Sequence, residues 1–240
     1  MTKRIDDLVQ SICGAPDHPL APVLRGWCHD ARPFIAFAET HTTKIRKKAR
    51  LAVRAGELTD LLAELAVAAS LARDRRFAVF YEPYRTTGLR GPDFRVVYKT
   101  HVTFHVEVTR LRRLEPAGDD PARSAFKLAR VVCDKIGQFP PGAVNLLAVV
   151  VPPGAESGAL APAAVRLLDG PPQREMGPLS PELPLQNVRT YLRQRQRLSA
   201  VALCSFTPDW RPLVVKLWFN PRAKHPLRPE IGRYLAGTPS

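Results

Sequence analysis

The chain has 240 residues, of which 36 are Lys or Arg and 22 are Asp or Glu, so its formal net charge is +14. This length allows one domain with a buried core and additions, and the charge favours a polyanion such as nucleic acid or an anionic membrane surface. No apolar run approaches the roughly 18 residues of a membrane span, and the N-terminus lacks the apolar core of a signal peptide. We therefore expect a cytoplasmic protein with a nucleic-acid partner and no membrane association, although part of the Arg excess can equally reflect genome composition.

The cysteines do not suggest a metal site or a disulfide framework. They are scattered, with no Cys-x-x-Cys pair and no spacing typical of zinc. We interpret them as buried or idle thiols. They are Cys13, Cys28, Cys133 and Cys204.

The first 56 residues are predicted to be helical. Two short helices, 5–13 and 22–29, precede a longer helical pattern that begins at Pro33 and ends near Gly56. The longer pattern contains five basic residues within seven positions, from Lys44 to Arg50. This cluster is either a solvated helix face or a ridge that contacts phosphates.

The next predicted helix, residues 57–73, is apolar on nearly every side between Leu61 and Ala72, and Glu64 is the only charge in that stretch. Such a helix is typical of a core, and an ionised carboxylate there is costly unless it is paired or bound to a metal. The alternative is that Glu64 lies on a narrow solvent-exposed edge with Glu57 and Asp60.

A short strand of a buried kind, residues 77–81, leads to a predicted β-hairpin at 91–110. Each arm alternates apolar and polar residues, so each has one apolar face and one face with a carboxylate. A three-residue turn at 99–101 aligns the apolar faces and places Asp93 opposite Glu107. Two carboxylates so close together are unfavourable without a cation between them. The hairpin therefore predicts a metal site.

The remaining elements follow in order. They are a helix at 121–138, a continuous apolar strand at 143–151, a proline-rich excursion at 152–184 that is either flexible or a lid, a basic helix at 187–198, strands at 200–206 and 213–219, and a final helix at 229–235.

In this order of elements the chain resembles the PD-(D/E)XK nuclease superfamily, which has the restriction-endonuclease-like fold. Pro92-Asp93 matches the PD element, Glu107-Val108-Thr109 falls at the (D/E)XK element, and Glu64 matches an acidic residue of the first core helix. The resemblance implies an α/β (α+β) fold with an αβββαβ core at 57–151 and a central mixed sheet flanked by helices. Residues 1–56 would be an N-terminal helical embellishment, 152–184 a loop, and 185–240 a basic helix, a C-terminal β-hairpin and a terminal helix packed on the same domain.

The resemblance also implies an activity, the Mg²⁺- or Mn²⁺-dependent hydrolysis of phosphodiester bonds in DNA by an endonuclease. Asp93 and Glu107 would hold the metal, and Glu64 would bind through water or a second ion. Basic residues would supply a salt-dependent hold on the nucleic-acid backbone. The candidates are Lys44, Arg46, Lys47, Lys48, Arg50, Arg110, Arg112, Arg113, Arg193 and Arg197.

The sequence departs from the superfamily pattern at Thr109, where a lysine is usual. Lys135, with Gln138 a turn later, could reach in from the following helix. Arg95 lies on the carboxylate face opposite His105, whereas Arg110 points to the other face if the strand continues. His105 is either a general base or a structural residue.

Two other functions stay open. Thr109 and the net charge favour a nuclease fold that binds nucleic acid without cutting it, and a protein-interaction or assembly factor is the third alternative. The sequence does not decide between DNA and RNA, and it leaves a homodimer open.

Overall fold

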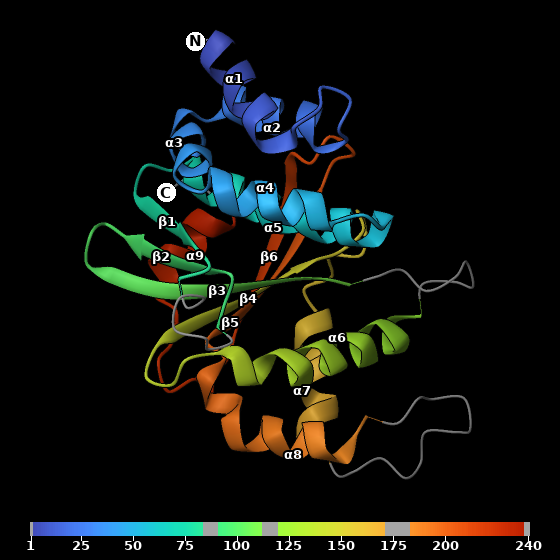
Figure 1. Cartoon of the computed structure of the whole chain (residues 1–240). Coiled ribbons are helices and arrows are strands. Elements are labelled where there is room, and N and C mark those ends of the chain that lie inside the picture. The colour runs from blue at the N-terminus through green and yellow to red at the C-terminus, as the bar shows by residue number, and fades with distance from the viewer. Residues whose placement is uncertain (1, 84–90, 112–119, 171–182, 238–240) are drawn as a thin grey trace.

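The computed structural model describes residues 2–83, 91–111, 120–170 and 183–237. A six-stranded mixed sheet lies between two layers of helices, and its strands follow one another in chain order (Figure 1). β1 to β3 and β5 to β6 pair antiparallel, whereas β3, β4 and β5 are parallel. The predicted α/β class is confirmed, and the predicted closing hairpin extends this same sheet. The strands are β1 (Phe77–Tyr81), β2 (Phe94–Tyr98), β3 (Val102–Arg110), β4 (Val144–Val150), β5 (Ala200–Phe206) and β6 (Pro212–Phe219).

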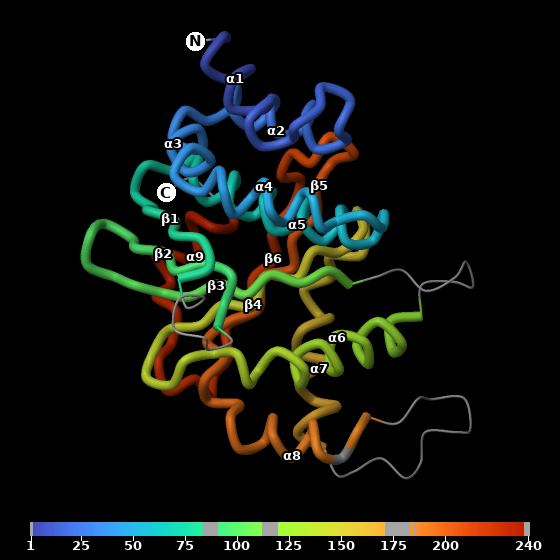
Figure 2. Tube along the Cα trace, in the orientation of Figure 1, coloured from blue at the N-terminus to red at the C-terminus, as the bar shows by residue number. Residues whose placement is uncertain are grey.

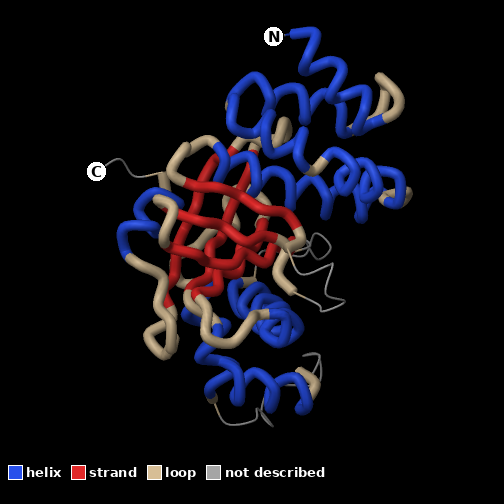
Figure 3. Tube along the Cα trace, turned by 60° about the vertical axis from the view of Figure 1, so that its left-hand side comes forward, coloured by secondary structure: helices blue, strands red, loops and turns tan. Residues whose placement is uncertain are grey.

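Two hydrophobic clusters occupy the two faces of the sheet. Alternate residues of β4 enter different clusters, with Ala148 in one and Leu147 and Val149 in the other. β4 is therefore the central strand covered on both faces that its apolar run predicts. Figures 2 and 3 show the two helical layers on either side of the strands.

The N-terminal helices form one layer, in which α5 contacts β1 and β3. This layer comprises α1 (Thr2–Cys13), α2 (Leu20–Asp30), α3 (Arg32–Thr40), α4 (Thr42–Leu51) and α5 (Ala55–Ala72). The other layer comprises α6 (Pro121–Lys135), α7 (Leu160–Asp169) and α8 (Leu185–Gln194), with the 3₁₀ turns η2 (Ile136–Gln138) and η3 (Arg195–Arg197). The last helix, α9 (Pro229–Leu235), is attached to the hairpin because Glu230 accepts hydrogen bonds from Tyr98 and Lys99, both at 2.6 Å.

Two sequence predictions were wrong in detail. The helical pattern from Pro33 to Gly56 is divided into α3 and α4 at His41, whose φ and ψ are −109° and 14°. The hydroxyl groups of Thr40 and Thr42 donate to the carbonyls of Ala36 and Ala38 at 2.8 Å, and such bonds to the preceding turn favour bending of a helix.

The second error concerns β1, which is predicted to be mostly buried but is an edge strand in which two of the five residues are exposed. Its burial alternates, and Phe80 remains 39% exposed. The guanidinium carbon of Arg95 lies 4.2 Å from the centre of the Phe80 ring and covers part of it. A run of apolar residues therefore marked a strand correctly but not its place in the sheet.

The hairpin has the predicted register. Phe94 pairs with Val106 and Tyr98 with Val102, which leaves the predicted three-residue turn at 99–101. The turn contains no glycine, and Lys99 and Thr100 adopt positive φ values of 47° and 67°. Lys99 is held there by its ion pair with Glu230.

The four cysteines are buried and unpaired, as predicted. Burial raises the pKa of the Cys13 thiol to about 11 and those of the Cys28, Cys133 and Cys204 thiols to about 12. Among the described helices, none is long and apolar enough to cross a membrane. α7 occupies part of the predicted proline-rich excursion, and residues 171–182 lie outside the described part of the chain.

Candidate active site

Asp93 and Glu107 are brought together by the β2–β3 hairpin. Asp93 directly precedes β2, and because Phe94 pairs with Val106, Asp93 falls opposite Glu107 one step further along the strands. The backbone N–H of Val108 donates to Asp93 Oδ2 at 2.8 Å, which holds this carboxylate beside β3. The facing of the two carboxylates that the alternation predicts is thus present.

The Glu107 side chain is 2% exposed and carries one paired and one unpaired oxygen. Lys135 Nζ, from the end of α6, donates to Glu107 Oε1 at 2.6 Å. Glu107 Oε2 is buried and has no hydrogen-bond partner among the described residues. An unpaired buried carboxylate oxygen is costly, so this atom is a candidate ligand for a cation.

Glu64 lies on α5 and has partners from two other elements. Its Oε2 accepts hydrogen bonds from Lys48 Nζ of α4 and from the Tyr81 hydroxyl of β1, each at 2.6 Å. Lys48 Nζ also lies 3.0 Å from Glu82 Oε1. The Glu64 side chain is 19% exposed and lines the same cavity as Asp60, whereas Glu57 is exposed outside it, so the predicted edge with Glu57 and Asp60 is present only in part.

The carboxylates repel one another. Burial first, and then the charges of Glu64 and Glu107, raise the pKa of Asp93 well above its ordinary value. Burial also raises the pKa of Glu107, although Lys135 opposes this effect. Burial alone would lower the pKa of Lys48, but the surrounding carboxylates, Glu64 foremost, outweigh it and leave that pKa raised. Burial is thus the larger cause of the raised pKa of both carboxyls, and the neighbouring carboxylates add to it.

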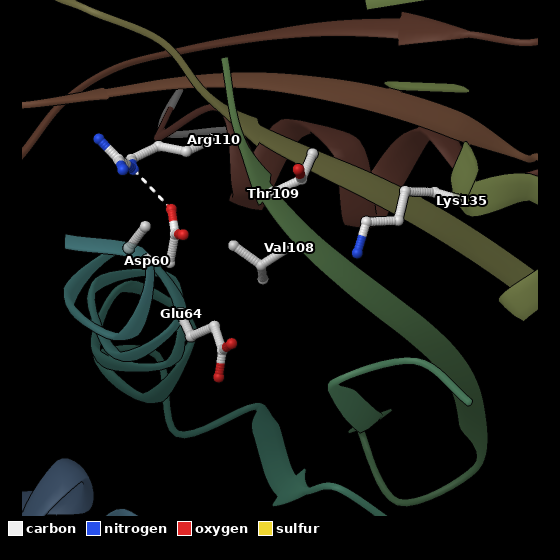
Figure 4. A pocket seen from close by; sticks show the side chains of 7 residues that line it. Asp60, Glu64, Val108, Thr109, Arg110 and Lys135 are labelled. Atoms are coloured by element: carbon white, nitrogen blue, oxygen red, sulfur yellow. Dashed lines mark hydrogen bonds and ion pairs between the residues drawn. The ribbon is translucent and has the colours of Figure 1, made fainter. Parts of the chain in front are cut away.

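A cavity of about 300 Å³ opens beside Glu64 and Lys135 (Figure 4), and neither Asp93 nor Glu107 is among the described residues that line it. Figure 4 shows Asp60 and Glu64 of α5 on one side of β3 and Lys135 on the other. Arg110 Nε donates to Asp60 Oδ1 at 2.8 Å, which holds the guanidinium at the wall of the cavity. The lining consists of Asp60, Ala63, Glu64, Val108, Thr109, Arg110 and Lys135.

Thr109 stands in this cavity where the superfamily pattern has lysine, and its hydroxyl carries no charge. The positive charge comes instead from Lys135, which the structure places at the carboxylate as the sequence suggested. Gln138 lies three residues further on, in η2, and is not among the described residues that line the cavity.

His105 and Arg95 face each other in the hairpin, as predicted. Burial, followed by the charge of Arg95, lowers the pKa of His105 to about 4. The imidazole is therefore neutral at pH 7, and it is not one of the described residues that line the cavity.

The basic cluster of α4 is divided between inward and outward side chains. Lys44 Nζ donates to the backbone carbonyls of Tyr81 and Glu82, at 2.8 and 3.3 Å, and Arg46 donates to the carbonyl and hydroxyl of Ser11. Lys48 is held by carboxylates, as described above. Lys47 and Arg50 are the two members of the cluster with exposed side chains.

The other predicted basic residues are not adjacent to that cluster. Arg193 is exposed near the end of α8, which packs in the opposite helical layer. Arg197 Nη1 donates to the carbonyl of Phe139 at 3.4 Å. Arg112 and Arg113 lie outside the described residues. The predicted basic residues of the described helices therefore lie in different helical layers.

Sequence reasoning missed Glu82, Tyr81 and Asp60. Glu82 directly follows β1, where a carboxylate at the end of a predicted strand is a usable signal. It adopts a positive φ of 45°, and its backbone N–H donates to the Asp93 carbonyl at 2.6 Å. The contacts of Lys48 with Tyr81 and Glu82 span more than 30 positions in the chain, so local patterns could not predict them.

Within the described ranges, no group of three or more His, Cys, Asp or Glu side chains is arranged to hold a metal ion. Asp93 and Glu107 are a smaller donor set, two hard carboxylates with one unpaired oxygen, and Mg²⁺ commonly takes one or two carboxylates together with water and phosphate oxygens. The residues present therefore fit Mg²⁺ or Mn²⁺.

Comparisons with protein-family models, with curated proteins and with solved structures found no match for this chain.

Proposed function

We propose that this protein is a metal-dependent nuclease of the restriction-endonuclease-like type, which hydrolyses phosphodiester bonds in DNA. The observation that carries the proposal is the pairing of Asp93 with Glu107, whose Oε1 is bound by Lys135 while its Oε2 is buried without a partner. The net charge of +14 supports a polyanionic substrate.

Asp93 and Glu107 would hold Mg²⁺ or Mn²⁺. When bound, such an ion polarises a phosphoryl oxygen and lowers the pKa of a bound water. The Val108 N–H fixes the orientation of the Asp93 carboxylate, and Lys48 and Tyr81 fix that of Glu64. These bonds pre-organise the acidic groups before substrate arrives.

Lys135 would supply the positive charge that Thr109, at the position of the usual lysine, lacks. Its ammonium group favours the ionised form of Glu107 that a metal requires, because it opposes the rise that burial causes in the pKa of that carboxyl. It also lines the cavity, where its charge can stabilise a phosphate.

The test is cleavage of plasmid and single-stranded DNA, with RNA in parallel, in the presence of Mg²⁺ or Mn²⁺. Loss of an outer-shell partner of a metal typically costs roughly 10- to 100-fold in activity. We expect Lys135→Met to fall in that range. Asp93→Asn and Glu107→Gln should lose more than about 100-fold, because they remove candidate ligands.

Asp17→Asn is the matched control, since Asp17 is an exposed carboxylate between α1 and α2. It should cleave as the unchanged protein does. Equal cleavage by the Glu107→Gln protein would exclude the proposed site, and the absence of cleavage by the unchanged protein would exclude the activity.

A second function, binding of nucleic acid without cleavage, is favoured by one observation. Lys48 and Lys135 already lie on Glu64 and Glu107 at 2.6 Å, in positions where cations neutralise the carboxylates. A protein of this kind would bind DNA in EDTA with an affinity that falls steeply with salt. It would show no cleavage with either metal.

A further inference from the structure

A second cavity, of about 380 Å³, lies where the parallel strands β3, β4 and β5 end. In open α/β sheets the carboxyl edge of the parallel strands is the usual place for a ligand. This cavity is separate from the acidic one and has no role in the proposed hydrolysis. Its lining includes Leu111, Val150, Pro152, Phe206 and Trp210, with Arg110 at one side.

The walls of this second cavity are mainly apolar and partly aromatic. The rings of Phe206 and Trp210 have their centres 6.0 Å apart and are inclined by 36°. Thr59 and Thr207 add hydroxyl groups. A flat, apolar molecule with polar edges fits such a lining better than a charged one does.

Trp210 is held in place before any ligand binds. Its backbone carbonyl accepts a hydrogen bond from Trp27 Nε1 at 3.0 Å, and its N–H donates to the Thr207 carbonyl at 2.9 Å. Its φ of 61° is one that L residues rarely adopt. The turn between β5 and β6 is therefore pre-organised.

Arg110 joins the two cavities, because its side chain lines both. Its guanidinium group donates to Asp60 Oδ1 (Figure 4) and to the carbonyl of Gly56, at 2.8 and 3.2 Å. A polar cavity lined by two carboxylates and two cations, next to the pair Asp93 and Glu107, thus adjoins an apolar one, and the Arg110 side chain lies between them. A nucleotide likewise consists of a charged phosphate joined to a flat, largely apolar base.

We propose that the second cavity binds an unpaired nucleobase of the strand whose phosphate lies beside Asp93 and Glu107. This inference rests on the proposed function and defines its substrate. A base inside a duplex is stacked and paired, so it reaches a cavity only from a single strand or after leaving the helix. The preferred substrate is therefore single-stranded, frayed or flapped DNA.

The test is a binding measurement with the full chain in EDTA, where no metal-dependent cleavage takes place. The probes are fluorescein-labelled oligo(dT)₁₀ and a decamer of abasic deoxyribose phosphates of the same charge. We expect oligo(dT)₁₀ to bind roughly 5- to 150-fold more tightly, the range that one base–aromatic stack produces. Equal affinities for the two probes would overturn the proposal without any change to the protein.

Protein variants test whether the preference for bases arises at this cavity. Trp210→Ala should reduce the affinity for oligo(dT)₁₀ towards that for the abasic decamer and leave the abasic affinity unchanged, and Trp210→Phe should retain much of the preference. Leu213→Ala is the matched control, because Leu213 is 52% exposed on β6 and does not line the cavity. A base preference that survives in a folded Trp210→Ala protein would exclude this cavity as the binding site.

The outcomes separate this inference from the proposed function. Cleavage that depends on Glu107, combined with equal binding of the two decamers or with preferred binding of duplex DNA, would overturn the inference alone. Base-dependent binding without cleavage would overturn the nuclease activity and leave the base cavity supported. Binding of neither decamer, or binding of an aromatic peptide only, would overturn the inference, and together with the absence of cleavage it would overturn both.

Discussion

At the scale of single residues, the Asp93 carboxylate lowers the free energy of unfolding at neutral pH. Its pKa is raised above the ordinary 3.8 by burial and by the Glu64 and Glu107 charges. The folded protein therefore binds a proton that the unfolded chain releases, and the free energy of unfolding falls as the pH rises from about 4 towards the folded pKa. Burial and charge repulsion at Asp93 therefore lower the stability of the folded protein at neutral pH.

The first prediction follows from this fall in the free energy of unfolding with rising pH. Asp93→Asn keeps an oxygen that can accept from Val108 but removes the charge, so we expect the variant to unfold a few degrees higher than the unchanged protein at pH 7. Below pH 4 the two melting temperatures should converge. Thermal unfolding followed by circular dichroism between pH 3 and pH 8 measures this.

The Asp17→Asn protein should melt like the unchanged protein throughout that range. If Asp93→Asn lowers the melting temperature at pH 7, the carboxylate stabilises the fold, and the repulsion between the three acidic groups is not the dominant effect.

The individual site residues differ in how far the sequence predicts them. The facing of Asp93 and Glu107 follows from two alternating arms and one turn length, and both are local properties. The contact of Lys135 with Glu107 could be anticipated because Lys135 lies at the end of the helix that follows the hairpin. To predict that Glu82 belongs to the site, one must know where Lys48 lies. That position depends on tertiary packing of α4 and cannot be seen in a local sequence pattern.

At the scale of elements, α4 connects the N-terminal layer to the site through Lys48. The ammonium group lies 2.6 Å from Glu64 Oε2, 3.0 Å from Glu82 Oε1 and 4.8 Å from the centre of the Tyr81 ring. One side chain of α4 therefore joins α5 and β1. The sequence left open a solvated face or a phosphate-contacting ridge for this helix, and in the structure Lys44, Arg46 and Lys48 bond to groups within the protein.

The second prediction concerns this connection. Lys48→Met keeps the length of the side chain but leaves Glu64 and Glu82 without their cation, so it should destabilise the protein by about 1–3 kcal/mol at pH 7, between the values for exposed and buried ion pairs. The loss should diminish at pH 4, where carboxylates take up protons. Urea unfolding at the two pH values measures it.

Lys47→Met is the control, because Lys47 is the exposed neighbour on the same helix. We expect it to change the free energy of unfolding by less than about 0.5 kcal/mol. Equal effects of the two substitutions would mean that the inward ion pairs do not stabilise the fold.

The elements themselves were largely predictable, since helix and strand periods are local. The exceptions depend on tertiary structure. The boundary between α3 and α4 depends on two threonines that bond back to the preceding turn, and β1 looks like a central strand although nothing pairs with its outer edge among the described residues. The parallel pairing of β4 with β5 requires contacts across more than 50 positions.

At the scale of the whole molecule, the site lies where both helical layers meet the sheet. Glu64 and Lys48 come from one layer, Lys135 from the other, and Asp93 and Glu107 from the hairpin between them. A ligand at this junction bridges the two layers. It should therefore stabilise the entire fold and not one segment of it.

The third prediction is that Mg²⁺ or Mn²⁺ raises the melting temperature. At a metal concentration tenfold above the dissociation constant, binding contributes about 1.4 kcal/mol, or about 3–6 °C for a domain of this size. Differential scanning fluorimetry with MgCl₂ measures the shift, and NaCl at equal ionic strength corrects for screening.

Glu107→Gln and Asp93→Asn should abolish the shift, and Asp17→Asn should keep it. If Glu107→Gln shows the full shift, the cation binds elsewhere on the molecule.

The net charge was readable from the sequence, but its distribution was not. Of the five basic residues in α4, three are held by groups inside the protein, and Arg193 lies in the other layer. Composition predicts the sign of the partner's charge, whereas the surface that meets it depends on which side chains the fold leaves exposed.

The four buried thiols can report which part of the fold opens first. Cys13 and Cys28 lie in the N-terminal layer, Cys133 in the opposite layer and Cys204 in the central sheet. Their raised pKa values and burial keep them unreactive towards alkylating reagents while the fold is closed. Timed alkylation followed by peptide mass analysis would thus record, without any introduced label, which layer separates first from the sheet.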